Sequence, residues 1–251
     1  MTTYQPQLSA EATPEPAGLP QDPAEHFAGY AVLGLPFSSG HYLAFRDFPF
    51  SSIGPGYRSV WHRTPDGEWT IYANAAPEFS CARYFGAAIH HTAKTDVDIR
   101  WDGPFTARIS VPGVVDWRLE LGTSPAASML TAVAVRMPGP LWRNESVLRS
   151  MGAFAGPLLH AGKMKVSGVV PNGHTFQAQP RRLWVVLDSQ ATILDEDAGA
   201  PGPLPVQDHL ADFWLPQRGL FAADVGVRFP STAAQPQPGH AHAAPRTKEA
   251  A

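Results

Sequence analysis

Between residues 97 and 121, three short runs alternate apolar and polar positions. Successive side chains on a strand point to opposite faces, so this alternation predicts strands with one buried face and one polar face. Asp102-Gly103 and Pro112-Gly113 separate the runs at the places where hairpin turns fit. The stretch therefore predicts three antiparallel strands joined by tight turns.

Similar signals occur on both sides of this stretch. Pro-Asp-Gly at residues 65–67 and Pro-Asn-Gly at residues 171–173 each stand between alternating runs, which predicts two more hairpins. Other apolar runs predict strands at 42–46, 129–136, 182–187, 210–215 and 220–229, the last as a candidate edge strand. Consecutive hairpins of this kind favour an all-β, mainly antiparallel fold, either a lipocalin-like β-barrel or a related sandwich.

One helix is predicted at residues 145–160, where apolar side chains recur at helical spacing. Asn144 is a suitable N-cap, and Gly162 is a suitable stop. Pro157 is expected to bend the last turn. The fold prediction is thus a curled sheet with one packed helix.

The chain has 251 residues, of which 44% are hydrophobic, so it can form a sizeable core. Residues 26–230 are predicted to form a single β-barrel-like domain, with two similar halves as an open alternative. Residues 1–25 and 231–251 are rich in Pro, Gln and Ala and are predicted to be disordered tails.

The formal net charge is −3, which gives no general attraction to nucleic acid or to anionic lipid. No apolar run approaches the ~18 residues of a membrane span, and residues 1–25 lack the basic start and apolar core of a secretory signal. Cys81 is the single cysteine, which excludes an intramolecular disulfide. We expect a cytoplasmic protein without a nucleic-acid partner or stable membrane insertion, and the oligomeric state stays open.

The histidine pair His90-His91 is the most conspicuous polar motif. Adjacent side chains on a strand face opposite ways, so two neighbouring histidines seldom bind one metal ion together, and no metal or cofactor is expected. Imidazole titrates near neutral pH, which makes a histidine a candidate general base. The candidates on predicted strands or turns are His62, His90 and His174.

Acidic candidates lie on the alternating runs. Asp116 and Glu120 share one face of the run at residues 115–121, and Asp98 lies on the first run. If this face is exposed to solvent, the charges are ordinary surface groups. If it lines a barrel lumen, burial would raise a carboxyl pKa and allow the acid to protonate an alkene or an enol.

Other side chains are candidates for ligand binding. Arg143 stands just before the predicted helix, where its guanidinium could bind a carboxylate or phosphate in a bidentate fork or pair with Glu145. A catalytic thiol at Cys81 is weighed against a buried structural cysteine, which is the commoner case. Aromatic candidates for contact with a ligand, each with core packing as the alternative, are Trp61, Tyr84, Trp101 and Trp117.

The segments at residues 98–104 and 165–173, together with consecutive strands, one helix and many tryptophans, carry a family resemblance. The chain resembles the lipocalin-like (calycin) barrels, and within them the carotenoid 1,2-hydratase or hydroxyneurosporene synthase group. The resemblance implies an apolar, isoprenoid-like or other lipidic ligand. No catalytic residue of that group can be assigned to a position in this chain.

The sequence therefore predicts a soluble β-barrel protein with an apolar pocket for a small hydrophobic molecule. In the first interpretation the protein is a hydratase or isomerase of the lyase type. Its acid is then Asp98, Asp116 or Glu120, and its base His62, His90 or His174. The alternatives are a non-catalytic carrier or sensor, and a structural or assembly protein. The face of residues 115–121 that points inward separates the first two, because a wholly apolar lumen favours a carrier.

Overall fold

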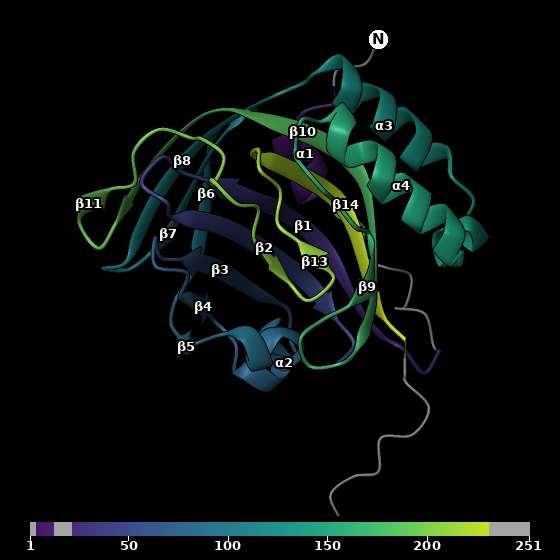
Figure 1. Cartoon of the computed structure of the whole chain (residues 1–251), viewed down its shortest axis with the longest axis horizontal. Helices are drawn as coiled ribbons and strands as arrows, with labels where there is room; N and C mark the ends of the chain where they lie inside the picture. Colours follow the sequence, from purple (N-terminus) through teal and green to yellow (C-terminus); the bar gives the residue numbers. More distant parts are fainter. Residues whose placement is uncertain (1–3, 13–21, 231–251) are drawn as a thin grey trace, which may run out of the picture.

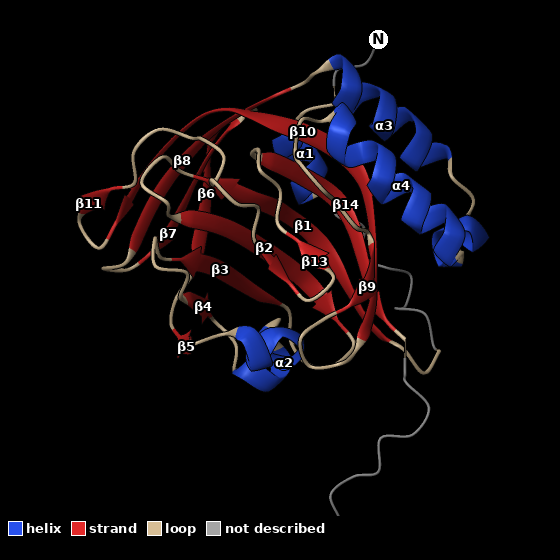
Figure 2. Ribbon diagram, viewed as in Figure 1, coloured by secondary structure: helices blue, strands red, loops and turns tan. Residues whose placement is uncertain are grey.

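The computed structural model describes residues 4–12 and 22–230, which form a mainly β protein with a few helices (Figures 1 and 2). The main sheet follows the hydrogen-bonded order β5-β4-β3-β2-β1-β14-β10-β8-β7-β6, with β9 and β11 also paired to β10. Its strands are β1 (Glu25–Pro36), β2 (Tyr42–Ser51), β3 (Tyr57–Arg63), β4 (Trp69–Ala73), β5 (His91–Lys94), β6 (Asp98–Gly103), β7 (Thr106–Val111), β8 (Val115–Gly122), β9 (Ser167–Val169), β10 (Thr175–Ile193), β11 (Glu196–Asp197) and β14 (Leu220–Phe229).

A separate two-stranded hairpin and several helices complete the described residues. The hairpin consists of β12 (His209–Leu210) and β13 (Phe213–Trp214). The α-helices are α1 (Pro6–Glu11), α2 (Ala82–Phe85), α3 (Pro125–Arg136) and α4 (Glu145–Leu158), and the 3-10 helices are η1 (Pro77–Phe79), η2 (Gly86–Ala88) and η3 (Gly139–Arg143). None of the helices within residues 4–12 and 22–230 combines the length and apolar character needed to cross a membrane.

The main sheet is strongly curled and almost wholly antiparallel, with β4 and β5 as its parallel pair. Among the described strands, β5 and β6 form the two ends of the order and do not pair with each other. The prediction of a mainly antiparallel β fold is confirmed in this form, as a half-barrel and not a closed barrel. Three of the hairpin turns predicted from turn sequences join β3 to β4, β7 to β8 and β9 to β10. The turn between β6 and β7 was predicted at Asp102-Gly103, but these residues belong to β6 and the turn lies at residues 104 and 105.

Strand β10 connects the two parts of the sheet. Residues 177–185 pair with β14, and residues 185–193 pair with β8. Between its pairings with β9 and β8, one edge of β10 lies against α3, where the hydroxyl of Thr131 accepts a hydrogen bond from the backbone N–H of Leu183 at 2.9 Å. The helix thus satisfies a strand edge that no neighbouring strand covers.

Each face of the curled sheet has its own core. The sheet–sheet core joins side chains of β1, β2, β3 and β14 to those of β7, β8 and β10, and its largest members include Phe45, Trp117, Trp184 and Phe221. The helix-facing core lies on the other face with α2 and part of α3, and it includes Phe27, Tyr42, Trp61, Tyr84 and Leu159. The alternation of β8 follows this division, because Trp117 and Leu119 are buried whereas Asp116 and Glu120 are exposed.

The predicted helix at 145–160 is confirmed as α4, which lies beside α3 (Figure 2). Asn144 caps it as predicted, since its side chain accepts hydrogen bonds from the N–H groups of Ser146 and Val147 at 3.0 and 3.2 Å. A Cβ added at Gly156 would overlap the carbonyl oxygen of Gly162. Glycine at this position therefore lets the helix approach the following loop closely.

Two element predictions were wrong. Residues 129–136, expected as a strand, belong to α3, whose N-cap Ser124 accepts from the N–H of Ala127 at 3.1 Å. A short apolar run does not by itself distinguish a strand from a packed helix. Residues 220–229, expected as an edge strand, form β14, which lies between β1 and β10.

Strand β1 was not predicted, and its burial explains why. Its residues are buried or half-buried on both faces, so the alternation that reveals a one-sided strand is missing. The bulge of β1 near residues 32–34 leaves carbonyl groups that Arg46 of β2 satisfies, since its guanidinium donates to the oxygens of Val32 and Leu33.

The prediction of disorder for residues 1–25 is wrong for the part that contains α1. The backbone carbonyl of Tyr4 accepts from the indole N–H of Trp184 at 3.2 Å, and the N–H of Gln7 donates to the oxygen of Pro104 at 3.3 Å. Contact with the sheet thus orders a segment whose composition alone does not favour structure. Residues 231–251 lie outside the described residues, and the single domain over 26–230 stays a prediction.

We expect Trp117→Ala to lower the free energy of unfolding by about 3–5 kcal/mol, because the side chain is fully buried and its indole N–H donates to Ser189 Oγ at 2.8 Å. Glu120→Ala, on the exposed face of the same strand, should change it by no more than about 0.5 kcal/mol. Urea unfolding of both variants measures the difference. Equal losses of unfolding free energy in the two variants would contradict the assignment of Trp117 to the buried face and Glu120 to the exposed face of β8.

Candidate functional site

The predicted acids lie on the surface and apart from one another. Asp98 pairs with Arg58 at 3.2 Å, Asp116 pairs with Arg108 at 3.1 Å, and Glu120 is exposed on β8. Asp116 and Glu120 occupy the face of β8 that points away from the sheet–sheet core. The structure therefore does not place these carboxylates in an apolar lumen, which was the condition for their raised pKa.

The predicted bases occupy three separate environments. His62 is buried on β3, with its Nε2 atom 2.9 Å from Nδ1 of His41 and the two rings stacked. His90 is exposed, and its Nδ1 accepts from the backbone N–H of Trp69 at 3.0 Å. His174 is half-buried against the edge of the Tyr84 ring. Within residues 4–12 and 22–230, no three His, Cys, Asp or Glu side chains form a group that could hold a metal ion.

The predicted aromatic contacts all pack within or against the two cores. Trp61 and Trp117 are fully buried, and Trp101 packs edge-on against Phe221. The hydroxyl of Tyr84 donates to Glu25 Oε2 at 2.6 Å, and burial, followed by this contact with Glu25, raises the pKa of Tyr84.

Cys81 is buried as well, with its Sγ atom 2.7 Å from the hydroxyl of Tyr57. Burial raises the pKa of the Cys81 thiol, which disfavours the reactive thiolate. This environment suits the structural interpretation of the cysteine.

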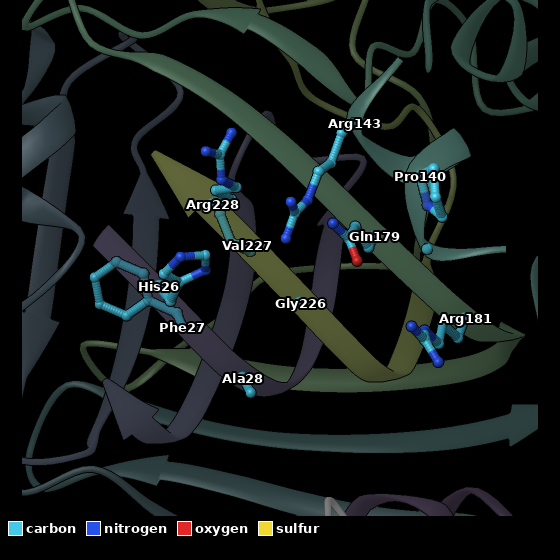
Figure 3. Close-up of a pocket in the computed structure, with 11 residues that line it drawn as sticks. His26, Phe27, Ala28, Pro140, Arg143, Gln179, Arg181, Gly226, Val227 and Arg228 are labelled. Carbon is cyan, nitrogen blue, oxygen red and sulfur yellow. The ribbon is translucent and has the colours of Figure 1, made fainter. Parts of the chain in front are cut away.

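Arg143 lines a cationic pocket of about 730 Å³ (Figure 3). Three neighbouring strands and one 3-10 helix contribute side chains to this pocket. They are His26 from β1, Arg228 from β14, Gln179 and Arg181 from β10, and Arg143 from η3. In Figure 3, Arg143 extends from η3 toward Gln179 and Arg228, while Arg181 lies farther along β10. Three guanidinium groups thus surround one cavity.

Asp22 is the carboxylate in contact with this cationic pocket. Its Oδ1 atom lies 2.7 Å from Nε2 of His26, and its Oδ2 atom lies 3.4 Å from the Arg228 guanidinium and 4.0 Å from that of Arg143. The hydrogen bond with His26, together with one from the backbone N–H of Ala24 and the nearby positive charges, lowers the pKa of Asp22 to about 2 despite an opposing effect of burial. Asp22 is therefore ionised at neutral pH.

An apolar pocket of about 490 Å³ lies among α3, α4, β1, β10 and the segment at residues 164–166. Its lining consists of apolar side chains and two serines: Leu33, Leu130, Val133, Ala134, Ser146, Val147, Ser150, Met151, Phe154, Ala155, Leu159, Met164, Val166, Pro180 and Leu183. None of these described residues carries a titratable side chain. Phe154 and Val133 are 74% and 54% exposed, so large apolar surface remains open to solvent at this site.

The two pockets share strand β10. Gln179 and Arg181 line the cationic pocket, whereas Pro180 and Leu183 line the apolar pocket. One short segment of β10 therefore contributes to two chemically different cavities, which have no lining residue in common.

Sequence analysis identified Arg143 and predicted an apolar pocket, but it did not assign the residues that line that pocket. It did not consider Arg181 and Arg228. A signal was available in residues 179–182, where two arginines follow Gln-Pro in a strand with otherwise apolar neighbours. Nothing local in the sequence shows that Arg228 and Arg143 lie beside this segment.

Comparison with known proteins gives little further information. No protein-family profile matches the chain, and no curated protein sequence matches it. Among solved structures, an acetoacetate decarboxylase from Legionella pneumophila subsp. pneumophila str. Philadelphia 1 is similar with a TM-score of 0.39 and 9% sequence identity, over 88% of this chain and 91% of that chain.

The buried His62 predicts a pH-dependent stability. Burial, and next the neighbouring His41, lower the pKa of His62 from 6.5 to about 4. Between these pH values the unfolded chain binds more protons than the folded chain, so the free energy of unfolding falls as pH is lowered. The loss attributable to His62 should reach roughly 3 kcal/mol at most.

Urea unfolding at several pH values between 7 and 4 measures this dependence. His62→Gln should flatten the profile, whereas His91→Gln, which removes an exposed imidazole, should keep the slope of the original chain. An unchanged slope in the His62 variant would assign the pH dependence to other groups.

Proposed function

We propose that this protein binds a small hydrophobic molecule in the apolar pocket and does not convert it chemically, as a carrier or sensor. The observation that carries this proposal is the lining of the pocket, which is apolar apart from Ser146 and Ser150. Its volume of about 490 Å³ falls within the range of roughly 300–1,000 Å³ typical of small-molecule sites.

The exposed side chains around the pocket support binding. Phe154 and Val133 keep most of their surface in water, as does Met129 on the adjacent α3. Apolar contact with a ligand would remove such surface from water, which is favourable by roughly 25 cal/mol per Å². A cluster of exposed apolar side chains at a cavity is typical of a site that receives a partner molecule.

The distribution of titratable groups favours a carrier over a hydratase or isomerase. Acid–base catalysis requires a proton donor or acceptor within hydrogen-bond reach of the substrate. The acids and bases proposed from the sequence do not line the apolar pocket: Asp98, Asp116, Glu120, His62, His90 and His174. The catalytic alternative therefore lacks a general acid or base at the cavity best suited to an apolar substrate.

The class of ligand follows from the same lining. A predominantly apolar cavity with two hydroxyl groups suits an elongated hydrocarbon that carries at most one neutral polar end. An isoprenoid or another lipid-like molecule, the class that the calycin resemblance implies, meets this description. The serines would then orient the polar end.

A matched pair of variants tests the site. Ala155 lines the apolar pocket, whereas Ala153 lies on the same helix, exposed and outside the pocket lining. Ala155→Trp should fill the cavity and weaken binding of the apolar fluorescent probe 1-N-phenylnaphthylamine about tenfold or more. Ala153→Trp should leave the affinity within about twofold, since a tenfold change corresponds to 1.4 kcal/mol of lost contact.

The competing explanation is that the exposed surface of α3 and α4 docks against another protein. Native mass spectrometry of protein purified from its own host separates the two ideas, because a retained lipid-like mass supports the proposal. No saturable probe binding, or equal weakening by both tryptophans, would overturn it.

A further inference from the structure

We propose that the cationic pocket binds a second, chemically different ligand: a small molecule held through a phosphate monoester group. This inference is independent of the apolar pocket, because the two cavities have no lining residue in common. It rests on the charge of the pocket, on hydrogen-bond donors that lack good partners, and on the geometry of guanidinium groups.

The charge balance leaves the pocket strongly positive. Arg143, Arg181 and Arg228 line it, and among the described residues Asp22 is the carboxylate that contacts Arg143 and Arg228. The three guanidinium groups and the ionised Asp22 together leave a balance of about +2. A phosphate monoester carries about −1.5 to −2 at neutral pH and would neutralise this excess.

The arginines have unused hydrogen-bonding capacity. Arg228 donates to Asp22 and to Gln177 at the long distance of 3.4 Å, and its buried Nε–H has no partner among the described residues. Arg143 is 59% exposed on its side chain and comes no nearer than 4.0 Å to Asp22. Arg181 makes no hydrogen bond or ion pair within residues 4–12 and 22–230. Since each guanidinium has five N–H donors, many remain for a ligand.

The arrangement of the guanidinium groups and the volume of the pocket both favour a phosphate group attached to a small organic molecule. Arg143 and Arg228 come from η3 and β14 and approach the cavity beside the amide of Gln179 (Figure 3). Planar guanidinium forks match the oxygens of a phosphate bidentately, and the Gln179 amide can add a neutral donor. The volume of about 730 Å³ leaves room for the organic part of the molecule, with Arg181 farther along the strand.

Asp22 has a defined part in this arrangement. Its contact with His26 holds the Asp22 carboxylate beside the Arg228 guanidinium. There it neutralises one positive charge and repels an incoming anion. Asp22→Asn distinguishes two roles of this residue. The substitution keeps the shape of the side chain and one acceptor oxygen but removes the negative charge that repels an anion. If Asp22 mainly repels the ligand, phosphate binding becomes tighter, and if Asp22 mainly holds the site in shape, binding becomes weaker.

The experiment titrates inorganic phosphate into the full chain at pH 7.5 and low salt, by isothermal calorimetry or by NMR, with succinate as the dicarboxylate comparison. We expect saturable phosphate binding with a dissociation constant below ~10 mM, tighter than that of succinate and weaker as salt is added.

Arg143→Ala should weaken phosphate binding about tenfold. Arg149→Ala removes an exposed arginine of α4 outside the pocket and should leave binding within about twofold.

Asp22→Asn should have the opposite effect on affinity, so that phosphate binds several-fold more tightly. Circular dichroism and the melting temperature of each variant establish that it is folded. The proposal is overturned by the absence of saturable binding to the original chain, by equal losses in the Arg143 and Arg149 variants, or by weaker binding to the folded Asp22 variant. Tighter binding of succinate than of phosphate would overturn the assignment of the ligand as a phosphate.

Discussion

The backbone pairing of strand β10 is the interaction on which the rest of the structure depends. Its residues 177–185 hydrogen-bond to β14 and its residues 185–193 to β8, so one strand joins both parts of the curled sheet. A buried strand edge without partners is costly, and α3 meets this requirement through the hydrogen bond from Leu183 to Thr131. Helix α3 thus packs against the edge of β10 that the strand pairing leaves open.

Strand β10 also contributes side chains to both pockets. Gln179 and Arg181 line the cationic pocket, whereas Pro180 and Leu183 line the apolar pocket, so one strand contributes to two cavities of different chemistry. Pro180 has no N–H to donate, which suits the stretch of β10 between its pairings with β9 and β8, where no strand covers one edge. The molecule thereby presents one charged cavity and one apolar cavity.

The titratable groups of the chain mainly support structure. Asp98 and Asp116 neutralise arginines on the surface, Glu25 holds Arg83 and Tyr84 together, and His62 packs against His41. None of these groups lines the cationic pocket or the apolar pocket.

The sequence by itself determined the elements that depend on local chemistry. The Asp-Gly, Pro-Gly and Asn-Gly turns specified the hairpins because glycine adopts backbone conformations that those turns require, and Asn144 marked the start of α4 through its capping side chain. Tertiary structure alone decided what lies between distant segments. Strand β1 is buried on both faces and shows no alternation, β14 became central through its partners β1 and β10, and residues 129–136 became helical against the sheet. The cationic pocket joins His26 to Arg228 across nearly the whole described chain, and the apolar pocket joins Leu33 to Leu183. Such sites arise from strand pairing over long sequence separations, which no local pattern records.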